Sequence, residues 1–190
     1  MKQLLVLIGF LGCCILPKAQ TPGLSEFNSN LHSGPLAPTD GNGTLGWIYN
    51  NTVCGLDYVT GSVRTGLRGT INGVPQPAGI SISGIPSNAV ILKAYLWTGG
   101  PANGMNVTAT LSNPNSQSAN FNMTMIGQGP DICWAYPGTY HYRADVTSII
   151  SRNGTYMVSG LPTNPPNTTT DMNGATLMII YNDPSQIWKG

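Results

Sequence analysis

The chain has 190 residues, of which only 8% are charged, and its eight Lys and Arg nearly balance its seven Asp and Glu. Soluble globular domains carry about 25% charged residues, so this chain is unusually poor in charge. The composition excludes a nucleic-acid-binding protein that relies on clustered Lys and Arg, a highly charged disordered chain and a coiled coil. The scarcity of titratable side chains, including only two His, also argues against a catalytic domain.

Residues 1–19 have the pattern of a secretory signal peptide. A basic start at Lys2 precedes an apolar run from Leu4 to Leu16, and Ala19 supplies a small residue near the cleavage site. The apolar run is shorter than the roughly 20 residues that span a bilayer. We therefore expect export, cleavage on one side of Gln20, and no membrane span in the mature chain. A buried N-terminal helix is the alternative.

The chain has four cysteines. Cys13 and Cys14 lie in the predicted leader, where lipidation of either is an alternative to simple cleavage. The mature chain keeps Cys54 and Cys133, and an even number in an exported protein favours one disulfide over two buried thiols. A bridge would close a loop of about 80 residues and contribute roughly 4 kcal/mol on the chain-entropy model.

An irregular lead-in is expected over 20–46, followed by one β-sandwich domain over 47–190. Short runs of β-branched and aromatic residues alternate there with turn residues, including Gly99–Gly100–Pro101 and Gly127–Gln128–Gly129–Pro130. This spacing is typical of an all-β antiparallel sandwich. The predicted strands cover 56–60, 62–68, 78–83, 90–98, 105–111, 120–126, 139–143, 154–160 and 175–181.

The apolar patterns also predict burial and one helical segment. Residues 105–111 and 120–126 alternate apolar and polar side chains, which indicates one packed and one solvated face. The runs at 90–97 and 175–181 are almost continuously apolar, as in central strands. Asp145 begins a short helical crossover near 145–151. An apolar segment at the end of the chain predicts that the last sheet continues beyond it.

Few residues are candidates for catalysis or metal binding. His32 and His141 lack the neighbours of a nucleophile–base pair, and Glu26 is the sole Glu. We therefore predict a protein that is not an enzyme. Asp40 and Asn42 resemble the start of a calcium loop without its distal Glu, so they are only weak metal candidates, and a turn explains them equally well.

The polar strand faces are rich in Asn and Thr, with aromatic residues nearby. Such faces suit sugar binding, and they also keep an extracellular sheet soluble without charge. The residues of a possible ligand face are Trp97, Trp134, Tyr140 and Tyr142.

Several separated motifs form a recognisable set: Gly55–Thr60, Lys93–Trp97, Gly127–Trp134, Tyr140–Thr147, Gly154–Tyr156 and Gly174–Pro184. Together they resemble the amino-terminal β-rich, DUF3344-like domain of secreted and surface proteins of Bacteroidetes-type bacteria. The resemblance covers roughly residues 50–190 and implies no catalytic residues.

The Arg143–Thr147 segment is also similar to the crossover of jelly-roll sugar-binding modules, which makes the expected sandwich jelly-roll-like. That similarity implies that Asp145 caps the crossover. Arg143 and Asp145 then lie on one side of a strand, where they are expected to form a structural ion pair.

The expected function is therefore a non-catalytic structural or adhesive module, secreted or displayed at the cell surface. The alternative is a carbohydrate-binding module attached to a larger secreted protein. Its expected partners are a glycan or protein at an extracellular surface, with no nucleic acid and no cofactor apart from the weak calcium candidate.

Overall fold

Alternating apolar and polar residues become strands that bury one face. The computed structural model describes residues 48–67, 73–102, 104–131, 136–163 and 170–186. The predicted leader and lead-in, and the residues Cys13, Cys14, Asp40, Asn42, Cys133 and Trp134, lie outside these ranges. The strands are β1 (Leu56–Arg64), β2 (Ala78–Ile82), β3 (Val90–Ala102), β4 (Val107–Ser112), β5 (Ser118–Gly129), β6 (Gly138–Asp145), β7 (Gly154–Ser159) and β8 (Gly174–Asn182).

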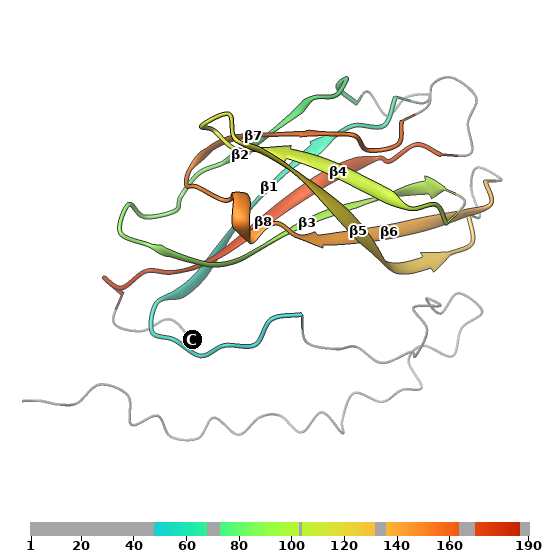
Figure 1. The fold of residues 1–190 in the computed structure, drawn as a ribbon. Coiled ribbons are helices and arrows are strands. Elements are labelled where there is room, and N and C mark those ends of the chain that lie inside the picture. The colour runs from blue at the N-terminus through green and yellow to red at the C-terminus, as the bar shows by residue number, and fades with distance from the viewer. Residues whose placement is uncertain (1–47, 68–72, 103, 132–135, 164–169, 187–190) are drawn as a thin grey trace, which may run out of the picture. The chain divides into compact units, whose positions relative to one another are not determined.

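The strands form one nearly closed eight-stranded sheet in the order β1-β8-β3-β6-β5-β4-β7-β2 (Figure 1). Every pairing is antiparallel, which confirms the predicted all-β antiparallel fold. The first four strands pair with the last four in reverse order, β1 with β8, β2 with β7, β3 with β6 and β4 with β5. This nested pairing is what a long antiparallel ribbon produces when it rolls up on itself.

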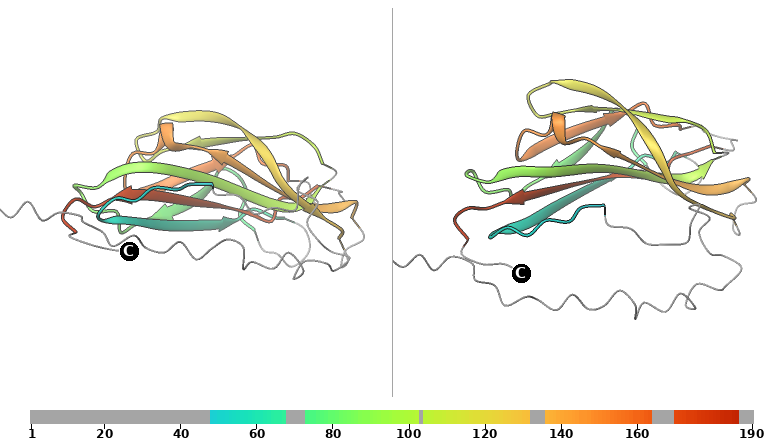
Figure 2. Two further views of the ribbon diagram at one scale, coloured as in Figure 1. Left: turned by 90° about the horizontal axis from the view of Figure 1, so that it is seen from below. Right: turned by 60° about the horizontal axis from the view of Figure 1, so that its bottom comes forward.

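β5 joins the two halves of the sheet. Its first part pairs with β4 and its last part with β6, and the register shifts between Met125 and Gly127. Figures 1 and 2 show this strand running from beside β4 across to β6. The bulge bends the strand, so that the halves β1-β8-β3-β6 and β5-β4-β7-β2 enclose a common core.

The core consists of the inward-facing residues of all eight strands. Leu96, Ala109, Tyr156, Leu177 and Ile179 are each 0% exposed. On β3, β6 and β8 the residues that alternate with the core residues point away from the core. This half of the sheet therefore has an outer face as well as an inner one. The outer face is where the candidate site lies.

The predicted crossover is a single turn of 3-10 helix, η3 (Thr147–Ile149). Asp145 holds its start, because its Oδ1 accepts hydrogen bonds from the Thr147 backbone N–H (3.0 Å) and from Thr147 Oγ1 (2.6 Å). The Val146 N–H donates to the Ala94 carbonyl at 3.0 Å, which fixes the turn against β3.

Two predicted turns belong to strands. β3 continues through Gly99–Gly100–Pro101 to Ala102, and β5 continues to Gly129. The segments 56–60 and 62–68, predicted as two strands, form the single strand β1. In β3, Gly99 and Gly100 mark a close approach of other chain segments rather than a turn.

Cys54 lies half-buried directly before β1, whereas Cys133 lies outside the described residues. The Cys54–Cys133 disulfide therefore stays a prediction. We expect the mature protein to resist alkylation until it is reduced, and then to gain two alkyl groups in intact-mass measurements. The Cys54→Ser variant should gain one group without reduction. Alkylation of both thiols in the unreduced protein would contradict the bridge.

Candidate functional site

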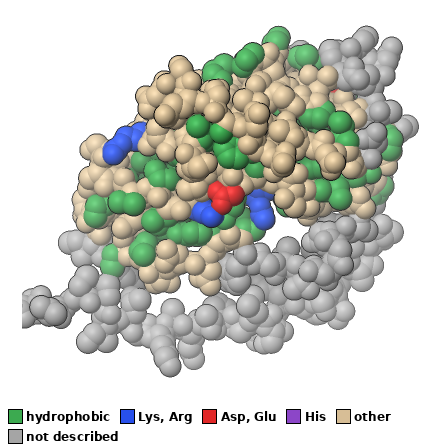
Figure 3. Space-filling view, in the orientation of Figure 1, with side chains coloured by type: hydrophobic (Ala, Val, Ile, Leu, Met, Phe, Trp, Pro, Cys, Tyr) green, Lys and Arg blue, Asp and Glu red, His purple; other side chains and the backbone are tan. Residues whose placement is uncertain are grey.

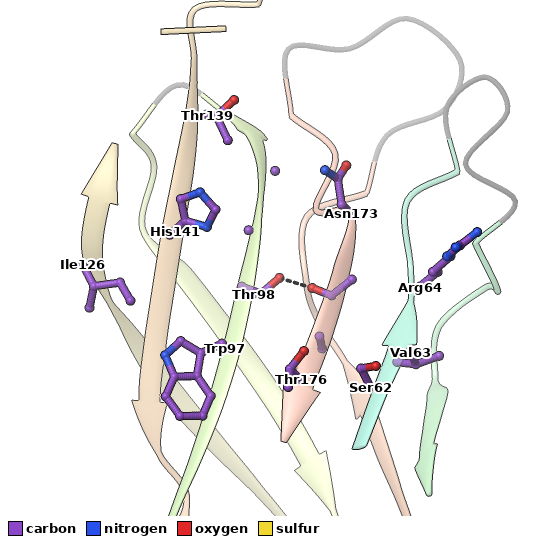
Figure 4. Close-up of a pocket in the computed structure, with 14 residues that line it drawn as sticks. Ser62, Val63, Arg64, Trp97, Thr98, Ile126, Thr139, His141, Asn173 and Thr176 are labelled. Atoms are coloured by element: carbon purple, nitrogen blue, oxygen red, sulfur yellow. Dashed lines mark hydrogen bonds between the residues drawn. The ribbon is translucent and has the colours of Figure 1, made fainter. Parts of the chain in front are cut away.

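An open groove of about 880 Å³ lies on the outer face of β1, β8, β3 and β6 (Figure 4). Its described lining contains no Asp or Glu, but it includes Arg64, His141 and Trp97. Figure 3 shows, in the orientation of Figure 1, that charged side chains are sparse among the tan and green atoms of the surface. The lining residues are Ser62, Val63, Arg64, Trp97, Thr98, Gly99, Gly100, Ile126, Thr139, His141, Asn173, Gly174, Ala175 and Thr176.

One row across the sheet gives the groove its floor. Arg64 pairs with Gly174, Gly174 with Gly99, and Gly99 with His141. Because neighbouring strands lie about 4.8 Å apart, the backbones of Arg64 and His141 are roughly 14 Å from each other. Both end residues are exposed. Side chains of basic type therefore stand at the two ends of a row whose two middle positions are glycines.

The imidazole of His141 lies over Gly99. A Cβ on Gly99 would come within 2.5 Å of His141 Nδ1, closer than real contacts allow. The glycine thus creates the space in which the imidazole rests. The glycine is needed for this side-chain arrangement rather than for a turn.

A second row places an aromatic side chain beside this floor. Ser62 pairs with Thr176, and Thr176 with Trp97. The Trp97 indole is half-buried and lies near Tyr95, with ring centroids 5.5 Å apart and planes at 54°. The Tyr95 hydroxyl donates to the Ile48 carbonyl at 2.6 Å, so this neighbour is itself fixed. The groove consequently presents one positioned indole beside the short hydroxyl side chains of Thr176 and Ser62.

The predicted Arg143–Asp145 ion pair is wrong, because Asp145 binds a different partner. Its Oδ2 lies 2.6 Å from Lys93 Nζ on the neighbouring strand β3. The Arg143 guanidinium instead lies over the Tyr95 ring, 5.4 Å from its centroid. Lys93 and Tyr95 share the outer face of β3. Arg143 therefore contacts Tyr95 across the strands, and Asp145 binds Lys93 across the strands instead of binding Arg143 on its own strand.

The pair shifts the pKa of both groups. The hydrogen bond and the charge of Asp145 raise the pKa of Lys93 above its ordinary value of 10.5. Partial burial pushes the pKa of Asp145 upward. The hydrogen bonds from Lys93 and Thr147 together with the Lys93 charge outweigh burial, and leave that pKa below 3.8. The side chains are 35% and 45% exposed, so solvent screens the pair and its contribution to stability is small.

Replacing Lys93 with glutamine is expected to raise the pKa of Asp145 part of the way back to its ordinary value. The two hydrogen bonds from Thr147 remain and preserve the rest of the shift. Because the pKa of Asp145 is lower in the folded protein than in the unfolded chain, the ionised carboxylate stabilises the fold at pH values above the unfolded-state pKa. This stabilisation is lost as the pH falls through the folded-state pKa. The variant should therefore lose less stability than the parent below pH about 4. Carboxyl NMR titration and urea unfolding at several pH values measure both effects.

The matched variant Arg143→Gln tests the corrected assignment. It should leave the pKa of Asp145 nearly unchanged, because Arg143 contacts Tyr95. An equal rise in both variants would restore Arg143 as the partner of Asp145.

Of the predicted ligand face, the described groove contains only Trp97. Tyr142 is 2% exposed, its hydroxyl donates to the Met105 carbonyl at 2.9 Å, and burial raises its pKa. Tyr140 points to the same side and packs against the core. Tyr142 is therefore wrong as a surface residue, and Tyr140 is half-buried and outside the groove lining. Alternation along β6 turns His141 outward instead, and Trp134 lies outside the described residues.

Sequence reasoning missed Arg64, Ser62, Thr176 and Asn173 as groove residues. Nothing local in the sequence showed that β1 and β8 lie beside β3. That arrangement depends on pairing between segments more than 70 residues apart in the chain.

No cluster of three His, Cys, Asp or Glu side chains suited to a metal occurs in the described part of the chain. The weak calcium candidates Asp40 and Asn42 lie outside it and stay a prediction. Over the same residues, no helix is long and apolar enough to cross a membrane. No family model, curated protein or solved structure matches the chain.

Proposed function

We propose that the chain is a secreted, non-catalytic adhesive module that binds carbohydrate in the groove on the β1-β8-β3-β6 face. The observation that carries the proposal is the placement of Trp97 in an open groove among Ser62, Thr176 and Asn173. A sugar ring has an apolar face and a rim of hydroxyls. An indole supplies apolar area to the first, and hydroxyl and amide groups bind the second.

The fold is compatible with this proposal. We infer a jelly roll from the nested pairing of β1–β4 with β5–β8. Jelly rolls occur in lectin domains among other classes, so the topology supports a binding role by analogy only. Sugar binding is inferred from the side chains of the groove.

The location outside the cell is supported by the sequence. The signal-peptide pattern at residues 1–19 and the low charge both suit an exported protein. The resemblance to surface proteins of Bacteroidetes-type bacteria adds the expectation that the module is part of a larger surface protein.

A glycan array tests the function. The mature protein, produced without residues 1–19, should bind a subset of immobilised glycans saturably and release no products from them. A folded, monodisperse protein that binds no glycan would overturn the proposal. Release of products would overturn its non-catalytic part.

A purely structural module is the second candidate, and one observation favours it. The outward polar side chains of β4 and β5 bind one another, in the pairs Thr108–Asn122 (3.0 Å), Thr110–Asn120 (2.7 Å) and Ser112–Ser118 (2.6 Å). Such self-satisfied pairs keep a sheet soluble without charge. A negative glycan array would favour this candidate.

A further inference from the structure

The charges of the groove indicate which saccharides it selects. Its described lining contains Arg64 and His141 and no carboxylate. The nearby carboxylate of Asp145 already binds Lys93. Asp171, whose backbone lies against Gly100, is 0% exposed, and its Oδ1 accepts a hydrogen bond from the Leu67 N–H at 3.4 Å. A ligand in the groove therefore meets the positive charge of Arg64, which no described acidic side chain in the lining offsets.

Arg64 is the group best placed to bind an anion. It is exposed at the end of β1, and no carboxylate of the described residues forms an ion pair with it. Its backbone carbonyl accepts the Val74 N–H at 3.0 Å, which holds the base of the side chain in place. A guanidinium binds a carboxylate or a sulfate through two parallel hydrogen bonds, which are stronger than neutral ones.

The distance between Arg64 and Trp97 suits one ligand that contacts both. They lie two strands apart and two residues apart along the sheet, so their backbones are separated by roughly 12 Å. Both side chains line the same groove, as Figure 4 shows. A sugar ring stacked on the indole can direct an acidic substituent toward the guanidinium across the glycine floor.

We propose that the groove selects acidic saccharides, with Trp97 stacking on a sugar ring and Arg64 binding its carboxylate or sulfate. This inference rests on the proposed carbohydrate-binding function and adds the class of ligand. The competing explanation is that Arg64 only protects the edge region of β1 from association and keeps it soluble.

Calorimetry with three oligosaccharides of equal length separates these explanations. The probes are an oligogalacturonide, a sulfated oligosaccharide and a neutral oligogalactoside. The mature protein should bind at least one acidic probe tenfold or more tightly than the neutral one. The preference should weaken as salt is raised, because the attraction is partly exposed to solvent. The tighter of the two acidic probes identifies the preferred anion.

Two variants with the same change of charge assign the effect. Arg64→Gln should weaken binding of the acidic probe tenfold or more and change neutral binding less than twofold. Arg152→Gln, at an exposed arginine that the groove does not include, should change neither. Arg64→Lys should recover part of the preference, since it keeps the charge without the paired donors.

Equal binding of acidic and neutral probes would overturn the inference and leave the proposed function standing. An equal effect of Arg64→Gln and Arg152→Gln would also overturn it, because the preference would then follow net charge alone. Failure to bind any of the probes, or any glycan on the array, would overturn the proposed function itself.

Discussion

Replacing Trp97 with alanine is expected to weaken saccharide binding by roughly 30-fold, which corresponds to a loss of about 2 kcal/mol, typical of an aromatic hot spot. The loss follows because the indole supplies the apolar area of the groove, and no other described lining residue is aromatic except the imidazole of His141. The fold should persist, since Trp97 is half-buried on the outer face and lies outside the core. Calorimetry with the best ligand from the array measures the effect, and circular dichroism checks the fold.

Two matched variants make the Trp97 result specific. Trp97→Phe keeps an aromatic face and should bind between the parent and the alanine variant. Tyr142→Phe removes a buried hydroxyl that donates to the Met105 carbonyl, so it should lower stability without changing binding. Unchanged binding by Trp97→Ala would show that the ligand lies elsewhere on the molecule.

The fold class could be predicted because local alternation reports burial directly. In β4, Val107, Ala109 and Leu111 are buried and the threonines between them face outward, as the sequence pattern indicated. The strand positions near residues 154–160 and 175–181 were also predicted to within a residue or so. These segments can be recognised from their own apolar residues and from the turn residues that flank them.

The Gly99–Gly100–Pro101 segment could not be read in the same way. Gly and Pro indicate a turn when only neighbours in the sequence are considered. Here β3 continues through them because the two missing side chains make room for distant segments, the His141 imidazole at Gly99 and the backbone of Asp171 to Asn173 at Gly100. The reason for these glycines lies in segments that follow them by more than 40 and more than 70 residues, respectively.

The candidate site was predicted only in part for a related reason. Trp97 was recognised by its residue type, but the tyrosines of β6 were assigned to the wrong face. Periodicity shows that Tyr140 and Tyr142 lie opposite His141 without showing which side is buried. The core decides this, because Tyr142 fills interior volume and its hydroxyl has a carbonyl partner there. Arg64 became a candidate only through the pairing of β1 with β8.

Gly99 and Gly100 provide the second large prediction, because adjacent alanine substitutions should have different consequences. Gly100→Ala would place a Cβ against the Asp171 carbonyl oxygen and within 3.0 Å of the Asn173 nitrogen. This segment is held to β3 by the Asp171 N–H donating to the Pro101 carbonyl (3.0 Å) and the Asn173 N–H donating to the Gly99 carbonyl (2.8 Å). The backbone has to move, so the variant should lose about 3 kcal/mol of unfolding free energy.

The Gly99→Ala variant is the matched control, because its new methyl group meets a side chain. The His141 imidazole can rotate away, so the loss of unfolding free energy should stay below about 1 kcal/mol. The raised floor and the displaced imidazole should nevertheless weaken binding of the saccharide. Urea unfolding and calorimetry on both variants check the pair. If Gly99→Ala unfolds as readily as Gly100→Ala, or binds as tightly as the parent, the floor formed by Gly99 does not shape the site.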